Sequence, residues 1–386
     1  MKGRAHHLIH WLLSEGTACL DMQDFLRCYT LVLRRHGLPV SRLFVGTILM
    51  HPQASGYIYH YEFEGDVAQQ GELSYERFAR LRRDKNSPME KMLATGRLFR
   101  ARLRLGEHLD MVDLASLADA GYTDLIGLPI TCGGLTEAGL TVATTASDGF
   151  AEEDVEDLAA ANPTFGVVAR LLMERQVQGT LLKAYLGEDA GDRVHRGQVR
   201  CGDTQIIPAA VWISDLRGFT RLSINHDAAV VVDLLNEVFE VVVREIRSHH
   251  GQVLKFLGDG VLATFAQTDV KSACLSALMA AQAVQTHLAS ISKARQSKGL
   301  PVTQTGIGLH YGEVIYGNIG APGRLDFTVI GPAVNLAARV ESLCAPLGES
   351  ILMTKDFADA LATPMTSCGA HALKGIADPV TVYRPD

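Results

Sequence analysis

Apolar residues recur at helical spacing in the second half of the chain and alternate with polar residues between the helical segments. Residues 228–248 place apolar side chains on one face of a helix, at Val231, Leu234, Leu235, Val238, Phe239, Val242 and Ile246. Two apolar runs within 252–265, separated by a Gly-Asp-Gly turn, predict a β-hairpin. Residues 270–288 predict a second helix.

Further strands are expected after this helix. Residues 303–310 alternate as in a strand, and a turn at 311–313 is expected before another strand over 314–319. A short strand at 327–330 leads to Pro332, which opens a helix because its missing N–H costs nothing in the first turn. The order βαββαββα with a strand-rich tail predicts an α+β domain over residues 206–386, with helices packed on a mainly antiparallel sheet.

The first half of the chain predicts a separate α/β domain over residues 1–185. Its helices and strands are expected, in order, at 8–16, 22–36, 43–50, 54–62, 87–105 (helical at first), 121–130 and 139–145. An acidic first turn at 149–154 opens a further helix, and 162–185 continues as an apolar helix. Glycines and charges in 186–205 predict a linker.

Composition narrows the classes of function. The chain has 386 residues, 47% of them hydrophobic and 20% charged, which is typical of a globular protein with more than one domain. Its net charge of −7 argues against nucleic-acid binding. Seven scattered cysteines without a CxxC pair favour free thiols, and no signal peptide or run of about 18 apolar residues is visible. We therefore expect a cytoplasmic protein with no membrane span.

Two short acidic motifs carry the clearest chemical signal. Asp215 ends an apolar run in the sequence WISDLRGFT, and Asp259 lies in the turn of the predicted hairpin, in KFLGDG. Two carboxylates at neighbouring strand ends can hold a pair of hard divalent cations against a triphosphate. An isolated aspartate at a strand end is more often a helix cap, but the pair favours a metal site.

These motifs resemble the class III adenylate/guanylate cyclase family. The resemblance covers about 206–384 and also includes FTVIGPAVNLAARVE at 327–341 and LKG at 373–375. It implies a ferredoxin-like (βαββαβ) catalytic domain. It also implies that Asp215, Leu216 and Asp259 form the site of two Mg²⁺ or Mn²⁺ ions, with the backbone that runs through Phe219 and Thr220 facing the phosphates.

The resemblance also implies which residues read the nucleotide. Lys255 and Thr328 match the base-selecting pair, whose donor and acceptor suit adenine, so ATP is the expected substrate. Asn335 would orient the ribose, and Arg339, four residues later on the same helix face, would stabilise the transferring phosphate. Lys374 matches a phosphate-contacting lysine. Because family members form the active site between two catalytic domains, and this chain carries one domain with both residue sets, a homodimer is expected.

Residues 1–180 resemble a GAF-type sensory domain in the segments 122–130, 139–145 and GFAEEDVEDL at 149–158. The resemblance implies regulation by a small molecule, or by bicarbonate given Thr328. A structural dimerisation domain without a ligand is the alternative. For the whole chain, the alternatives to an adenylate cyclase are a guanylate cyclase, which Lys255 disfavours, and a catalytically silent nucleotide-binding scaffold.

Overall fold

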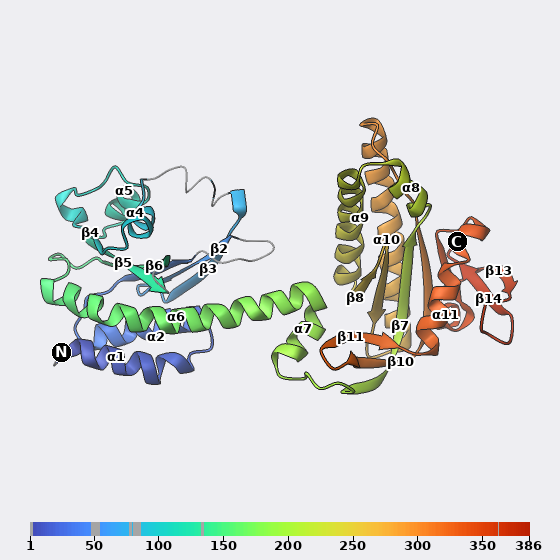
Figure 1. The fold of residues 1–386 in the computed structure, drawn as a ribbon, viewed down its shortest axis with the longest axis horizontal. Helices are drawn as coiled ribbons and strands as arrows, with labels where there is room; N and C mark the ends of the chain where they lie inside the picture. The colour runs from blue at the N-terminus through green and yellow to red at the C-terminus, as the bar shows by residue number, and fades with distance from the viewer. Residues whose placement is uncertain (1–2, 48–54, 77–78, 80–85, 133–134, 362) are drawn as a thin grey trace. The chain divides into compact units, whose positions relative to one another are not determined.

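The computed structural model describes residues 3–47, 55–76, 79, 86–132, 135–361 and 363–386 (Figure 1). The chain divides into two compact units, Met1–Leu181 and Leu182–Asp386. Each unit has its own sheet and its own buried core.

The first unit is built on an antiparallel sheet with the strand order β3-β2-β1-β6-β5-β4. Its elements are α1 (Arg4–Ser14), α2 (Met22–Arg35), β1 (Arg42–Thr47), β2 (Gly56–Glu62), β3 (Val67–Leu73), α4 (Pro88–Thr95), β4 (Phe99–Ala101), α5 (Leu114–Asp119), β5 (Asp124–Cys132), β6 (Leu135–Thr144) and α6 (Glu152–Leu186). The predicted helices and the four longer strands are confirmed. The predicted strand ends at 48–50 and 54 lie outside the described residues, and β3 and α5 were not predicted.

The two faces of this sheet carry different side chains. One face presents Tyr57, Tyr59 and Tyr61 of β2, each at most 2% exposed, to a core shared with α1, α2 and α6. Helices α4 and α5 lie over the other face (Figure 1). Because neighbours along a strand point to opposite faces, β2 fills one core with tyrosines and leaves smaller side chains on the other side.

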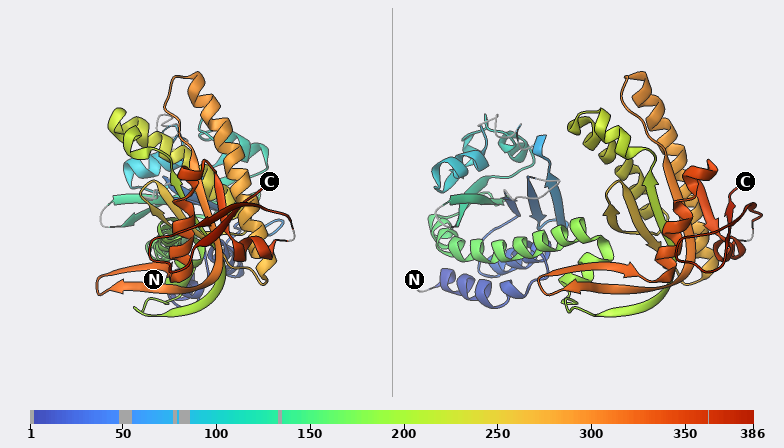
Figure 2. Two further views of the ribbon diagram at one scale, coloured as in Figure 1. Left: turned by 90° about the vertical axis from the view of Figure 1, so that its right-hand side faces the viewer. Right: turned by 45° about the vertical axis from the view of Figure 1, so that its right-hand side comes forward.

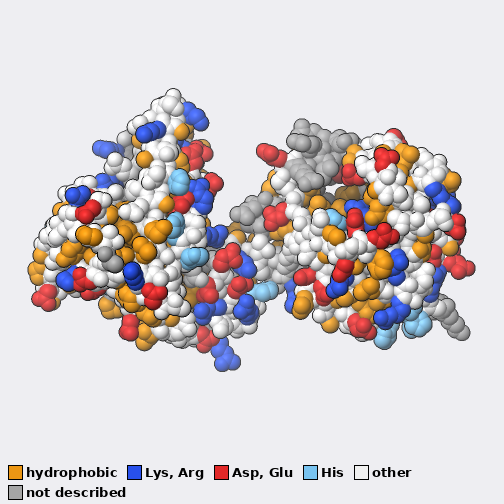
Figure 3. Space-filling model, turned by 180° about the vertical axis from the view of Figure 1, so that it is seen from behind, with side chains coloured by type: hydrophobic (Ala, Val, Ile, Leu, Met, Phe, Trp, Pro, Cys, Tyr) orange, Lys and Arg blue, Asp and Glu red, His pale blue; other side chains and the backbone are white. Residues whose placement is uncertain are grey.

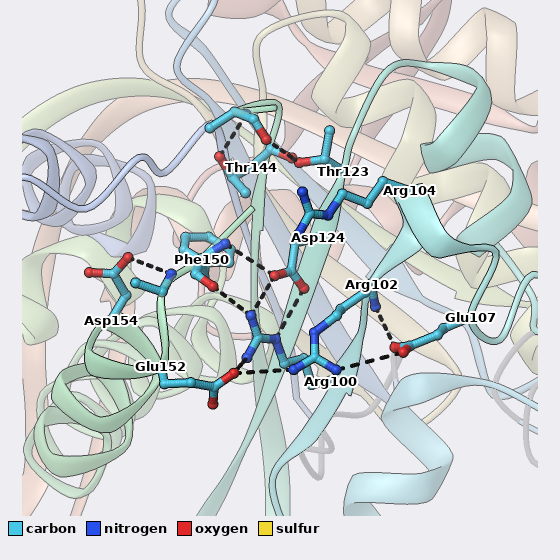
Figure 4. A network of polar contacts seen from close by, with 12 residues as sticks. Arg100, Arg102, Arg104, Glu107, Thr123, Asp124, Thr144, Phe150, Glu152 and Asp154 are labelled. Carbon is cyan, nitrogen blue, oxygen red and sulfur yellow. Dashed lines mark hydrogen bonds and ion pairs between the residues drawn. The ribbon is translucent and has the colours of Figure 1, made fainter. Parts of the chain in front are cut away.

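A polar network fixes the start of α6 to the sheet (Figure 4). The guanidinium of Arg100 on β4 pairs with Asp124 on β5 at 2.8 Å and with Glu152 on α6 at 2.7 Å, and it donates to the carbonyl of Phe150. Asp124 also accepts from the Phe150 N–H, and its side chain is 2% exposed. Since the charges of Arg100 and Asp124 are both largely buried, each charge is compensated by the other.

The second unit is built on a mixed sheet with the order β13-β14-β12-β10-β7-β9-β8, and β11 pairs with β10. Its elements are α7 (Glu188–His195), β7 (Thr204–Leu216), α8 (Phe219–Asn225), α9 (Ala228–Ser248), β8 (Gln252–Leu257), β9 (Gly260–Phe265), α10 (Val270–Ser297), β10 (Thr305–Ala321), β11 (Arg324–Ile330), α11 (Pro332–Glu341), α12 (Cys344–Leu347), β12 (Ile351–Thr354), α13 (Lys355–Ala360), β13 (Thr366–His371) and β14 (Val380–Arg384). The predicted order β–α–ββ–α–ββ–α is confirmed, and the sheet is antiparallel except for β10 and β12.

One predicted feature of this unit is wrong. The turn expected at 311–313 does not exist, because β10 continues through it and pairs Tyr311 with Ala210 and Gly312 with Ala209 on β7. Glycine in an extended strand lets another element approach closely, and here α11 packs over β10. The second half of β10, paired with β11 and with the first residues of β7, extends beyond the rest of the sheet (Figure 2).

Helices cover both faces of the second sheet. Ile307 and Leu309 of β10 face the core that contains α9 and α10, while Gly308 faces α11. A Cβ at Gly308 would lie 2.4 Å from the backbone N of Glu341 and 2.5 Å from the carbonyl oxygen of Ala337, so α11 rests directly on the strand backbone. Within 186–205, the expected linker, α7 buries Ala190 against this unit.

Acidic and basic side chains are interspersed over the face drawn in Figure 3. Among the described residues, no helix is both long and apolar enough to cross a lipid bilayer.

Candidate active site

The backbone of the second unit brings Asp215 and Asp259 together. Asp215 is the penultimate residue of β7, and Asp259 lies in the two-residue loop that joins β8 to β9, after Gly258 in a left-handed conformation (φ 70°). A Cβ at Gly260 would lie 2.4 Å from the Ser214 carbonyl oxygen and 3.2 Å from the Asp215 carboxylate. Glycine at 260 therefore lets the hairpin backbone approach the end of β7 directly.

The two carboxylates face each other. Burial raises the pKa of Asp215, and the charge of Asp259 raises it further, while a backbone hydrogen bond at Leu216 opposes the rise. Neither aspartate forms an ion pair with a basic side chain in the part of the chain that the structure describes. Hard divalent cations prefer such oxygen ligands, so the donor set fits the expected metal pair. Leu216 ends β7 as a buried residue next to Asp215.

A third carboxylate, which the sequence did not predict, lies near this pair. Gly306 pairs with Asp215 across β10 and β7, and a Cβ at Gly306 would lie 2.7 Å from Glu341 Oε1. Burial raises the pKa of Glu341 to about 7, and the charge of Asp215 adds to the rise while Arg217 opposes it. Glu341 follows Arg339 by two residues on α11 and is the last residue of the motif at 327–341, but the sequence analysis gave it no role.

Lys255 on β8 forms an ion pair with Asp326 on β11, with 2.8 Å between Nζ and Oδ2. The side chains are 33% and 49% exposed, so the pair lies at the surface of a single chain. The pair lowers the pKa of Asp326, mainly through the hydrogen bond from Lys255. Asp326 was not predicted as a site residue, although it lies two positions before Thr328.

Thr328 lies on the same side of β11 as Asp326, because side chains two residues apart share a face. It is 6% exposed and pairs with Gly317 on β10. Lys255 pairs with Leu262 and Leu262 with Ile213, which lies two residues before Asp215. Lys255 and Asp215 therefore share one face of the main sheet, and the ion pair brings Lys255 to the side of β11 that carries Thr328.

Asn335 and Arg339 lie on the exposed side of α11. The opposite side buries Ala333, Ala337 and Val340. Neither Asn335 nor Arg339 has a side-chain hydrogen bond or ion pair with any described residue. They lie four positions apart on the same helix, so both side chains are available to one partner outside this chain or to a ligand.

The remaining predicted residues lie in two places. Phe219 and Thr220 begin α8 directly after Gly218, and Phe219 packs partly against the core while Thr220 is exposed. Lys374 is exposed between β13 and β14, at the opposite edge of the sheet from β8. A single chain therefore does not place Lys374 beside the edge strand that carries Lys255.

Comparisons with known proteins find relatives of the second unit. The family model described as "Adenylate and Guanylate cyclase catalytic domain" matches residues 204–383. Two uncharacterized proteins of Mycobacterium tuberculosis are each 33% identical to this chain, one over 204 residues (53% of this chain and 36% of that protein) and one over 238 residues (60% and 42%). The chain thus spans less than half the length of these relatives.

Two solved structures are similar to this chain. The adenylyl cyclase CyaB from P. aeruginosa is 29% identical, with a TM-score of 0.44, over 47% of this chain and 94% of that one. A bacterial light-regulated adenylyl cyclase is 20% identical, with a TM-score of 0.50, over 89% of this chain and 93% of that one, which shows a shared fold. An α/β domain with an antiparallel sheet comes first in the chain. Because the family model matches residues 204–383 and the fold is shared, these residues are a class III nucleotidyl cyclase catalytic domain.

Proposed function

We propose that the protein is an adenylate cyclase, which converts ATP to 3′,5′-cyclic AMP and diphosphate in a homodimer under control of its N-terminal domain. The observation that carries the choice of ATP is the ion pair of Lys255 with Asp326 next to Thr328. An ammonium has three N–H donors, so Lys255 can keep Asp326 and still donate to adenine N1. The Thr328 hydroxyl can accept from the adenine amino group. Guanine would present donors to this ammonium, which favours ATP.

The roles of the other residues follow from their chemistry. Asp215 and Asp259, with Leu216 beside them, would hold two Mg²⁺ or Mn²⁺ ions, which would neutralise the triphosphate and activate the ribose 3′-hydroxyl. Asn335 would orient the ribose, and Arg339 would donate to the phosphate on which charge develops. Phe219, Thr220 and Lys374 would contact the phosphates.

Two observations support a homodimer. Asn335 and Arg339 are exposed and have no partner among the described residues, although they are the residues proposed to act on the substrate. Large apolar side chains are also exposed beside the nucleotide residues: Phe256 is 51% exposed, Leu257 45% and Ile330 44%. A second catalytic domain would cover these side chains and supply the residues that one chain keeps apart.

The N-terminal domain is proposed to regulate the cyclase as a GAF-like sensory domain that takes a small molecule or bicarbonate. Its antiparallel sheet with helices on both faces, and the direct continuation of α6 into the second unit, support this role. The alternative of a purely structural dimerisation domain predicts no effect of any small molecule on activity.

Product formation from ATP and from GTP, measured with Mg²⁺ and with Mn²⁺, tests the proposal. We expect cyclic AMP from ATP and little cyclic GMP. A preference for GTP would make the protein a guanylate cyclase, and binding of both nucleotides without turnover would make it a silent scaffold. The double variant Lys255→Glu with Thr328→Cys should lower kcat/KM for ATP more than for GTP. An unchanged ratio would mean that these residues do not read the base.

A further inference from the structure

The N-terminal unit contains a cavity of about 440 Å³ between its sheet and the helices α4 and α5. These are the helices that lie above the sheet in Figure 1. Pockets of about 300–1,000 Å³ are typical of small-molecule sites. On the other face of the same sheet, Tyr57, Tyr59 and Tyr61 pack into a buried core with apolar side chains of α1, α2 and α6.

Small residues on the sheet let α4 approach at one end of this face. Met89 and Met92 lie so close to Gly46, Gly127 and Gly139 that a Cβ at any of these glycines would lie 2.8 Å from a methionine side chain. Further along, Phe44 and Thr141, paired across β1 and β6, form the floor of the cavity. Helix α4 therefore packs tightly on these glycines, and the cavity lies over the neighbouring part of the same sheet face.

Among the described residues, the cavity lining is mostly apolar and includes one basic side chain. Phe44, Ile58, Leu93 and Leu117 line it, and so does the guanidinium-bearing side chain of Arg42 at the start of β1. Two acidic residues also line it. Asp113 is exposed, and Glu90 lies in the first turn of α4, where its negative charge interacts favourably with the helix dipole.

Arg42 is held beside the cavity by an ion pair with Glu62 and has no hydrogen bond to it. The distance between Nε and the nearest Glu62 oxygen is 3.6 Å, and Nε is buried and donates no hydrogen bond. The side chain is 19% exposed, and its guanidinium lies 5.6 Å from the centre of the Phe44 ring. Among the described residues, none accepts a hydrogen bond from this guanidinium, so an anionic group on a ligand in the cavity would supply a charge-assisted acceptor for the exposed part of the side chain.

We propose that this cavity binds a small, mainly apolar molecule with a ring system and a single anionic group, and that Arg42 pairs with the anion while Phe44 and Ile58 contact the ring. The proposal deepens the regulatory role proposed above for the N-terminal domain. It names the chemical class of the effector, an aromatic or alicyclic carboxylate or sulfonate. Bicarbonate alone would leave most of the apolar volume unfilled.

Two fluorescent probes that differ by one sulfonate group test the proposal on the full chain. 1-Anilinonaphthalene-8-sulfonate carries the anion, and N-phenyl-1-naphthylamine has the same rings without it. Both should bind saturably, one per chain, and ATP should not displace them. Arg42→Gln should weaken the sulfonate about tenfold, because a charge-assisted hydrogen bond is lost, and should leave the neutral probe nearly unchanged.

Arg27→Gln is the matched control, since Arg27 is an exposed arginine of the same unit that pairs with Asp66 outside the cavity. It should change the affinity of neither probe.

Thr141→Leu, which reduces the cavity at its floor, should weaken the binding of both probes, and thermal melting of each variant checks its fold. Equal affinity of the sulfonate for wild type and Arg42→Gln, or no saturable binding of either probe, would overturn the proposal. Cyclase assays on the same samples report separately on the proposed function, because basal turnover does not require this cavity.

Discussion

Lys255 and Asp326 lie 71 residues apart in the chain, and their charged atoms are 2.8 Å apart in the fold. The pair joins the edge strand β8 to β11 and holds the proposed base-reading ammonium on the side of β11 that carries Thr328. Asp326 is therefore a positioning residue for nucleotide choice in this proposal.

Replacing Asp326 by Asn should raise KM for ATP about fivefold and change kcat less, because a partly exposed ion pair contributes up to about 1 kcal/mol. The ATP/GTP ratio of kcat/KM should fall in parallel, and Asp326→Glu should restore part of it. Steady-state kinetics with both nucleotides measure this. A structural role alone would lower both nucleotides' kcat/KM equally and leave their ratio unchanged.

Replacing Asp215 or Asp259 by Asn should lower turnover by roughly a hundredfold or more, since each removes a proposed ligand of the metal pair. The melting temperature should stay the same or rise, because an uncharged amide removes two unfavourable effects, which also raise the pKa of Asp215. These are the desolvation of its charge and the repulsion between the two carboxylates. Asp359→Asn, at an exposed pair with Lys355, is the control. A variant with near-normal turnover at ordinary Mg²⁺ would contradict the metal assignment.

Mixing inactive Asp215→Ala chains with inactive Arg339→Ala chains should restore activity to about a quarter of wild type. Half of the dimers in an equal mixture are mixed, and each mixed dimer has one intact site of two. The same experiment with Asp215→Ala and Asp259→Ala should restore nothing, because both lesions affect the same half-site. If subunits demonstrably exchange and the first mixture stays inactive, the shared-site model fails.

Replacing Arg100 by Met should lower the free energy of unfolding of the N-terminal unit by about 3 kcal/mol, because Asp124 would remain buried without its cation. Chemical denaturation of the full chain, followed by a probe in this unit, measures the loss. Arg27→Met, at the exposed pair with Asp66, should have a much smaller effect. Equal effects of the two variants would show that the network in Figure 4 does not stabilise the start of α6.

The sequence by itself determined the helices and strands whose signals are local, and it identified the candidate site residues that lie in recognisable motifs. The periodicity of 228–248 predicted α9 with both its ends, and Pro332 marked the first residue of α11, because burial of one helix face and the chemistry of proline act over a few neighbouring residues. The same local signals predicted the β8–β9 hairpin and the strand before Asp215.

Only the tertiary structure decided which distant groups meet. It placed Asp326 against Lys255 and Glu341 near Asp215, and it carried β10 straight through the expected turn at Gly312 by pairing it with β7. Glycine favours turns in isolation, but a long antiparallel ladder outweighs that preference. The cavity beside Arg42 likewise arises from the packing of α4 and α5 on small residues of three strands, which no local pattern of the sequence encodes.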